Sequence, residues 1–263
     1  MKKIFAFAFL FISIQGIAQT QNNSLYRKQW FIEDGDTLPY RILLPQNFDL
    51  NKEYPLVLFL HGRGESGSDN EKQLTNGAKL FLTDSFRTNY PCIVVFPQCF
   101  ANNYWSNVQA VTDSTKTNKR EFYFTKHGEP TRAMRILLEL MQNLQIRFNL
   151  NQKQIYVMGL SMGGMGTFEI VNRLPNLFAA AVPICGGAHP GTAKNLTKTS
   201  WWIFHGAKDD VVPPINSEKM ADILKKNGAK VKFTLYPNAN HNSWDAAFAE
   251  PNLMKWLFSQ RKS

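Results

Sequence analysis

A serine flanked by glycines at residues 159–163 is the feature of this chain best suited to carry chemistry. The pentapeptide Gly159-Leu160-Ser161-Met162-Gly163 follows the apolar run 154–158 and precedes a helix-compatible stretch. In a sharp strand-to-helix turn, a serine projects its hydroxyl outward, and glycines on either side let strand and helix pack closely. The pattern predicts that Ser161 is a nucleophile, and the alternative is a tight turn filled by small residues.

A serine hydroxyl is a weak nucleophile and needs an imidazole to take its proton. Of the five histidines, His241 is the best candidate, because it lies in a polar loop after the last apolar run, 231–236. The alternative role for His241 is that of a loop or helix-capping residue. His61 ends an earlier apolar run, and we expect it to be structural.

The imidazole in turn needs a carboxylate that fixes its tautomer. Asp209 and Asp210 both follow the apolar run 201–204. We predict that Asp209 is this acid, because the spacing His-Gly-x-x-Asp places it at the apex of the loop, and that Asp210 is exposed or caps a turn. The order Ser161, Asp209, His241 along the chain is the one found in α/β hydrolases.

An oxyanion formed by attack on a carbonyl needs backbone N–H donors, which Gly-rich loops after an early strand supply. The segment 58–65, Leu-Phe-Leu-His-Gly-Arg-Gly-Glu, has this character. We assign the donors to the N–H groups of Met162 and Arg63, with Gly64 as the alternative for the second. A phosphate-binding loop is excluded, because its glycine spacing and Lys-Ser/Thr ending are absent.

Apolar runs that suit strands buried on both faces recur along the chain and alternate with helical patterns. Two runs around Asp34-Gly35-Asp36 predict an antiparallel hairpin before them. The pattern predicts a three-layer α/β sandwich with an eight-stranded, mostly parallel sheet. The predicted strands are 26–32, 38–44, 56–60, 92–96, 155–158, 179–184, 201–204 and 231–236, and the predicted helices include 133–144, 217–226 and 244–258.

Residues 1–18 have the basic, apolar and small-residue regions of a secretory signal peptide, with cleavage expected after Ala18. Its apolar core, 4–14, is too short to span a bilayer, and no cysteine follows the cleavage point to carry a lipid. We therefore expect a secreted or periplasmic protein with no membrane anchor, in which residues 19–263 form a single catalytic domain.

The formal net charge of +10 comes from scattered lysines and arginines. The densest run, 116–120, lies in a polar stretch and is typical of a solvated loop, so we expect no nucleic-acid partner. Cys92, Cys99 and Cys185 each adjoin an apolar run, and small buried thiols are the favoured interpretation.

Several segments together resemble one family, namely 61–71, 97–99, 159–166, 183–187, 205–213 and 241–244. It is the α/β-hydrolase family labelled predicted peptidase or phospholipase/carboxylesterase, related to dienelactone hydrolases and to the feruloyl and acetylxylan esterases of carbohydrate esterase family 1. The resemblance implies a triad of Ser161, Asp209 and His241, with no metal or organic cofactor. The sequence departs from the family at Arg63, where a small residue is usual, and at 106–130, which is longer and more polar.

The sequence thus predicts a secreted serine carboxylesterase. The resemblance implies small-molecule or polysaccharide ester substrates, and among these the acetyl or feruloyl esters of plant polysaccharides. Trp105 and Trp244 are candidates to line the substrate pocket. The alternatives are a serine peptidase related to prolyl oligopeptidases and a non-catalytic binding protein on a hydrolase scaffold.

Overall fold

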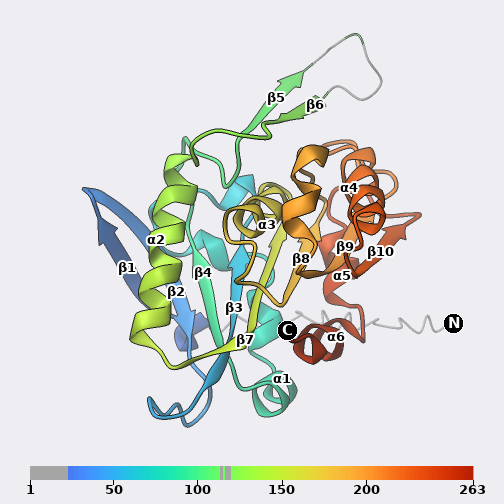
Figure 1. Cartoon of the computed structure of the whole chain (residues 1–263). Coiled ribbons are helices and arrows are strands. Elements are labelled where there is room, and N and C mark those ends of the chain that lie inside the picture. Colours follow the sequence, from blue (N-terminus) through green and yellow to red (C-terminus); the bar gives the residue numbers. More distant parts are fainter. Residues whose placement is uncertain (1–22, 113–114, 116–119, 263) are drawn as a thin grey trace, which may run out of the picture.

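The computed structural model describes residues 23–112, 115 and 120–262 (Figure 1). The predicted signal peptide, residues 1–18, lies outside the described residues. Within them, no helix is both long and apolar enough to cross a membrane.

All eight predicted strands are present and form one sheet in the order β1-β2-β4-β3-β7-β8-β9-β10. The antiparallel hairpin of β1 and β2 lies at one edge, β2 pairs antiparallel with β4, and the remaining neighbours are parallel. The strands are β1 (Arg27–Glu33), β2 (Asp36–Leu43), β3 (Tyr54–Leu60), β4 (Ile93–Pro97), β7 (Leu150–Leu160), β8 (Ala180–Ile184), β9 (Ser200–Gly206) and β10 (Val231–Tyr236).

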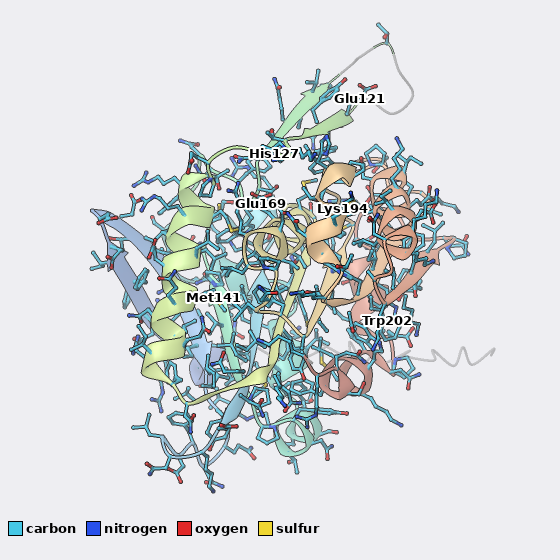
Figure 2. The ribbon with its side chains drawn as sticks, in the orientation of Figure 1. Glu121, His127, Met141, Glu169, Lys194 and Trp202 are labelled. Carbon is cyan, nitrogen blue, oxygen red and sulfur yellow. The ribbon has the colours of Figure 1, made fainter. Side chains whose placement is uncertain are left out.

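Helices cover both faces of this sheet, as the three-layer prediction requires. Alternate residues of one strand belong to different core clusters: Leu58 of β3 packs in one and Phe59 in the other. The first cluster includes Met141, and the second includes Trp202 (Figure 2). The first face is covered by α2 (Arg132–Arg147), α3 (Met162–Arg173) and α4 (Ile215–Lys226), and the second by α1 (Asp84–Asn89), α5 (Trp244–Phe248) and α6 (Leu253–Ser259).

The predicted helix 244–258 is wrong as one element, because it is split into α5 and α6. Pro251 lies between them. A proline has no N–H to donate and disfavours the helical conformation in the residue before it, here Glu250. The interruption lets α6 turn and bury Leu253 and Leu257 against the sheet.

The polar stretch 106–130 contains a second, two-stranded sheet that the sequence analysis did not predict. Strands β5 (Val108–Thr112) and β6 (Arg120–Phe124) pair antiparallel and project from the body of the molecule, above α3 in Figure 1. Of the predicted solvated run 116–120, residues 116–119 lie outside the described residues, and Arg120 is exposed at the start of β6. The described cysteines are free and buried, as expected.

The turn from β7 to α3 depends on the absence of a side chain at Gly163. A Cβ atom there would overlap the main-chain carbonyl oxygen of Leu60, at the end of β3. Backbone cannot move aside as a flexible side chain can, so only glycine lets α3 begin this close to β3.

Gly163→Ala should therefore lower the free energy of unfolding by at least about 2 kcal/mol. Gly64→Ala is the matched control, because a Cβ at Gly64 meets nothing within 4 Å, and it should stay within about 0.5 kcal/mol of wild type. Urea unfolding followed by circular dichroism measures both. Equal stability of the two variants would contradict the close approach.

Candidate active site

Ser161 lies between β7 and α3 in a conformation that few residues other than glycine adopt. Its φ is 54° and its ψ is −117°. The backbone is held there by its N–H, which donates to the carbonyl oxygen of Ile184 at 2.9 Å, and by its carbonyl oxygen, which accepts from Met165 in the first turn of α3. Such strain persists only where the surroundings impose it. The Oγ atom lies 3.0 Å from Nε2 of His241.

His241 reaches Ser161 from the loop between β10 and α5. Its Nδ1 lies 2.8 Å from Oδ2 and 3.0 Å from Oδ1 of Asp209. A carboxylate can only accept, so the proton is on Nδ1 and Nε2 is free to take one from the serine. Asn240 joins this loop to the loop that follows β9, because its Oδ1 accepts from the N–H groups of His241 and Asp210.

The carboxylate of Asp209 is buried and its oxygens are fully engaged. Besides His241, Oδ1 accepts from the N–H groups of Val211 and Val212, each at 2.9 Å. Burial by itself would raise the pKa of Asp209, but hydrogen bonds from His205 and His241 hold it well below its usual range. Asp210 is exposed to solvent. The structure thus brings Asp209, and not Asp210, to His241. The role of Asp209 as the orienting acid stays a prediction.

The two residues whose backbone N–H groups are assigned to an oxyanion site, Met162 and Arg63, each begin a helix. Met162 is the first residue of α3, and Arg63 is the first residue of a short 3-10 helix, Arg63–Glu65. At the first helical position an N–H has no acceptor within the helix. Both residues line the same cavity as Ser161, as does Gly64. Their role as oxyanion donors stays a prediction.

His61 supports this loop from below, in agreement with the structural role expected for it. Its Nε2 accepts from the N–H of Cys99 at 2.9 Å, so Nδ1 carries the proton and donates to the carbonyl oxygen of Gly62. Burial lowers the pKa of His61 from 6.5 to about 4, which keeps the ring neutral at physiological pH.

Trp105 does not line the cavity, although the sequence analysis proposed that it contacts substrate. The side chain is fully buried, and Nε1 donates to the carbonyl oxygen of His61 at 3.2 Å. The ring also packs under Gly166 of α3. Trp105 therefore belongs to the support of the active-site loop, and the expectation of a substrate contact does not fit this position.

A cavity of about 610 Å³ opens above Ser161, His241 and Trp244. One of its walls is the hairpin β5–β6, through the cross-strand pairs Ala110–Phe122 and Thr112–Arg120. These two pairs are two residues apart and therefore share one face of the hairpin. The β-branched residues of 108–112 and the aromatic residues of 120–124 were a signal for strands that the sequence analysis did not use.

The cavity carries charge at its rim. Arg63 and Arg120 line it, and the guanidinium of Arg63 lies over the ring of Tyr104, 5.2 Å from the ring centre. Glu65 also lines it, and burial raises the pKa of its carboxyl. The rim thus offers positive charge and aromatic surface to an incoming substrate.

Among the described residues, one group could offer three metal ligands, namely Cys185, Asp209 and His241, with ligand atoms within 4.8 Å of one another. Burial raises the pKa of the Cys185 thiol far above neutrality, whereas metals bind the thiolate. The oxygens of Asp209 are also occupied by protein donors. This donor set suits proton transfer better than metal binding.

The chain is similar to known proteins over most of its length. A family model described as phospholipase/carboxylesterase matches residues 49–252. A bifunctional acetylxylan esterase/xylanase from Neocallimastix patriciarum is 24% identical over 73% of this chain, and a probable feruloyl esterase C from Aspergillus terreus is 23% identical over 76%. The chain spans 24% and 66% of the lengths of these two relatives.

Solved structures show the same fold. The crystal structure of a thermostable esterase superposes with a TM-score of 0.80 at 31% identity, covering 91% of this chain and 64% of that one. A ferulic acid esterase superposes with a TM-score of 0.63 at 14% identity, covering 88% of this chain and 97% of that one.

The lowered pKa of His61 predicts a loss of stability in mild acid. Above pH 6.5, His61 is neutral in both the folded and the unfolded chain. Between pH 6.5 and about 4 only the unfolded chain takes up the proton, so the free energy of unfolding falls with falling pH, by at most about 3 kcal/mol from this group.

His61→Gln keeps an acceptor for the N–H of Cys99 but cannot titrate. The free energy of unfolding, measured in urea at intervals from pH 7 to pH 4, should therefore fall less steeply in this variant than in wild type. Parallel pH dependences would show that His61 is not buried in its neutral form.

Proposed function

Because the chain belongs to the phospholipase/carboxylesterase family, we propose that it is a serine carboxylesterase with Ser161 as nucleophile, His241 as base and Asp209 as orienting acid. The observation that carries the proposal is the continuous set of contacts from Ser161 Oγ to His241 Nε2, at 3.0 Å, and from His241 Nδ1 to Asp209 Oδ2, at 2.8 Å. This is the geometry by which a serine hydroxyl is activated.

In the proposed reaction, His241 Nε2 takes the hydroxyl proton while Ser161 Oγ bonds to the ester carbonyl carbon. The carbonyl electron pair moves to oxygen, and the N–H groups of Met162 and Arg63 stabilise that charge. The bond to the alcohol oxygen then breaks, and His241 returns the proton to the leaving alcohol. Water repeats the sequence on the acyl-enzyme, releasing the acid and free Ser161.

We propose acetyl or feruloyl esters of plant polysaccharides as substrates. The relatives named as acetylxylan and feruloyl esterases support this class. The cavity supports it as well, since Tyr104, Phe122 and Trp244 offer aromatic surface beside Ser161 for a phenolic acyl group. Export after cleavage at Ala18 would bring the enzyme to such polymers.

Ser161→Ala should lower kcat for p-nitrophenyl acetate by at least about 10³-fold, because the acyl-enzyme cannot form. Ser85→Ala is the matched control, since Ser85 is exposed on α1, which covers the opposite face of the sheet from α3. Release of p-nitrophenol measures both. Unchanged turnover in Ser161→Ala would remove Ser161 from the mechanism.

The specificity test uses acetylated xylan, methyl ferulate and aminoacyl amides, and it measures the acetate, the ferulate and the amine that each substrate releases. The proposal expects higher kcat/KM for the esters than for the amides. Faster cleavage of the amides would assign the site to a peptidase.

A further inference from the structure

The catalytic carboxylate proposed above contacts two histidines, and the mechanism uses only one of them. Besides His241, Asp209 contacts His205: Nε2 of His205 lies 3.1 Å from Oδ2, and neither side chain is exposed to solvent. His205 lies in β9, four residues before Asp209, so its backbone is held by the sheet.

The contacts of His205 determine where its protons are. Nε2 lies between two acceptors, Asp209 Oδ2 and the carbonyl oxygen of Val212 at 2.9 Å, so it carries a proton. Nδ1 lies 2.7 Å from the hydroxyl of Ser217. That hydroxyl donates to the carbonyl oxygen of Gly186 at 3.0 Å, and its oxygen is then left to accept from Nδ1.

All these contacts are satisfied together when His205 carries a proton on each ring nitrogen. A positive imidazolium then lies directly beside the Asp209 carboxylate, where neither ion is exposed. A buried ion pair of this kind is tolerated when its remaining donors and acceptors are also paired, and here they are.

We propose that His205 is a positioning residue that holds the Asp209 carboxylate in place for His241. Asp209 lies on a loop, which is a less rigid support than a strand. His205 connects that loop to three fixed elements: β9, the end of β8 through Gly186, and α4 through Ser217. The inference rests on the proposed triad and adds to it a second imidazole that does not touch substrate.

This arrangement has a consequence for the pH dependence of catalysis. Among the residues that the structure describes, the ionisable groups facing Asp209 are His205, His241 and Cys185. Burial raises the pKa of the Cys185 thiol, which is therefore uncharged. Lys208 and Asp210 lie on the same loop and are exposed. An uncharged side chain in place of the His205 imidazolium removes a positive charge that opposes protonation beside Asp209, so the acid limb of the kcat/KM profile should move to higher pH.

The test compares His205→Phe, which keeps a ring but no donor, with His205→Gln, whose amide nitrogen can occupy the place of Nε2 without a charge. His205→Phe should lower kcat by about 10- to 100-fold with little change in KM, because the reacting groups are misaligned while the binding cavity is intact. His205→Gln should recover most of kcat but keep the displaced acid limb. His127→Phe is the control, because His127 is an exposed residue of a loop (Figure 2). This variant should keep the wild-type kcat and the wild-type pH profile of kcat/KM.

If circular dichroism shows that His205→Phe does not fold, the test is the pH of the acid limb in the kcat/KM profile of His205→Gln. The proposal would be overturned if either folded variant had the wild-type kcat and the wild-type acid limb of the kcat/KM profile. It would also be overturned if activity fell only in proportion to the amount of folded protein. In each case an active wild type and an inactive Ser161→Ala would leave the proposed esterase function standing. An inactive wild type would instead remove the function itself.

Discussion

The arrangement of the site depends on one buried carboxylate. A charge taken out of water is unfavourable unless donors replace the water, and Asp209 has donors from two imidazoles and two main-chain N–H groups. This set of donors leaves the carboxylate few alternative positions. Because the carboxylate holds Nδ1–H of His241, it also leaves Nε2 as the atom that faces Ser161. The tautomer of His241 is therefore a consequence of the hydrogen bonds that satisfy the buried Asp209 carboxylate.

The parallel sheet explains why these residues meet although they are far apart in sequence. Ser161, Asp209 and His241 follow β7, β9 and β10, and Arg63 follows β3. Parallel strands place their carboxyl ends at one edge of the sheet, and ligands of such folds bind there. At Gly163, α3 approaches β3 closely, and Met162 and Arg63 line the same cavity. The hairpin β5–β6 adds a wall that belongs to neither layer of helices.

The strands of the main sheet, and the residues whose contacts join Ser161, His241 and Asp209, could be predicted from sequence. Buried parallel strands are continuous apolar runs, and the loops after them carry the polar residues. Other features depend on tertiary contacts that no local pattern contains. In the sequence, Trp105 resembles a loop aromatic near the site. In the structure it is buried, because its Nε1 donates to the carbonyl oxygen of His61 and its ring packs under Gly166. His205 looked like the end of a strand, and its contact with Asp209 depends on how the following loop turns back. Pro251 is a helix-breaking residue in the sequence, but the helical spacing of apolar residues in 244–258 led to the prediction of one continuous helix.

The most direct measurement of the central claim is the ratio of kcat/KM between Asp209→Asn and Asp210→Asn on p-nitrophenyl acetate. These variants make the same chemical change at adjacent residues, one buried against His241 and one exposed. An amide at 209 can donate to Nδ1 and so favours the wrong tautomer of His241, which should lower activity by about 10³- to 10⁴-fold. Asp210→Asn should stay within about twofold of wild type, as expected for an exposed site away from the chemistry. Equal losses, or a larger loss at 210, would contradict the claim that the buried Asp209 carboxylate organises the site.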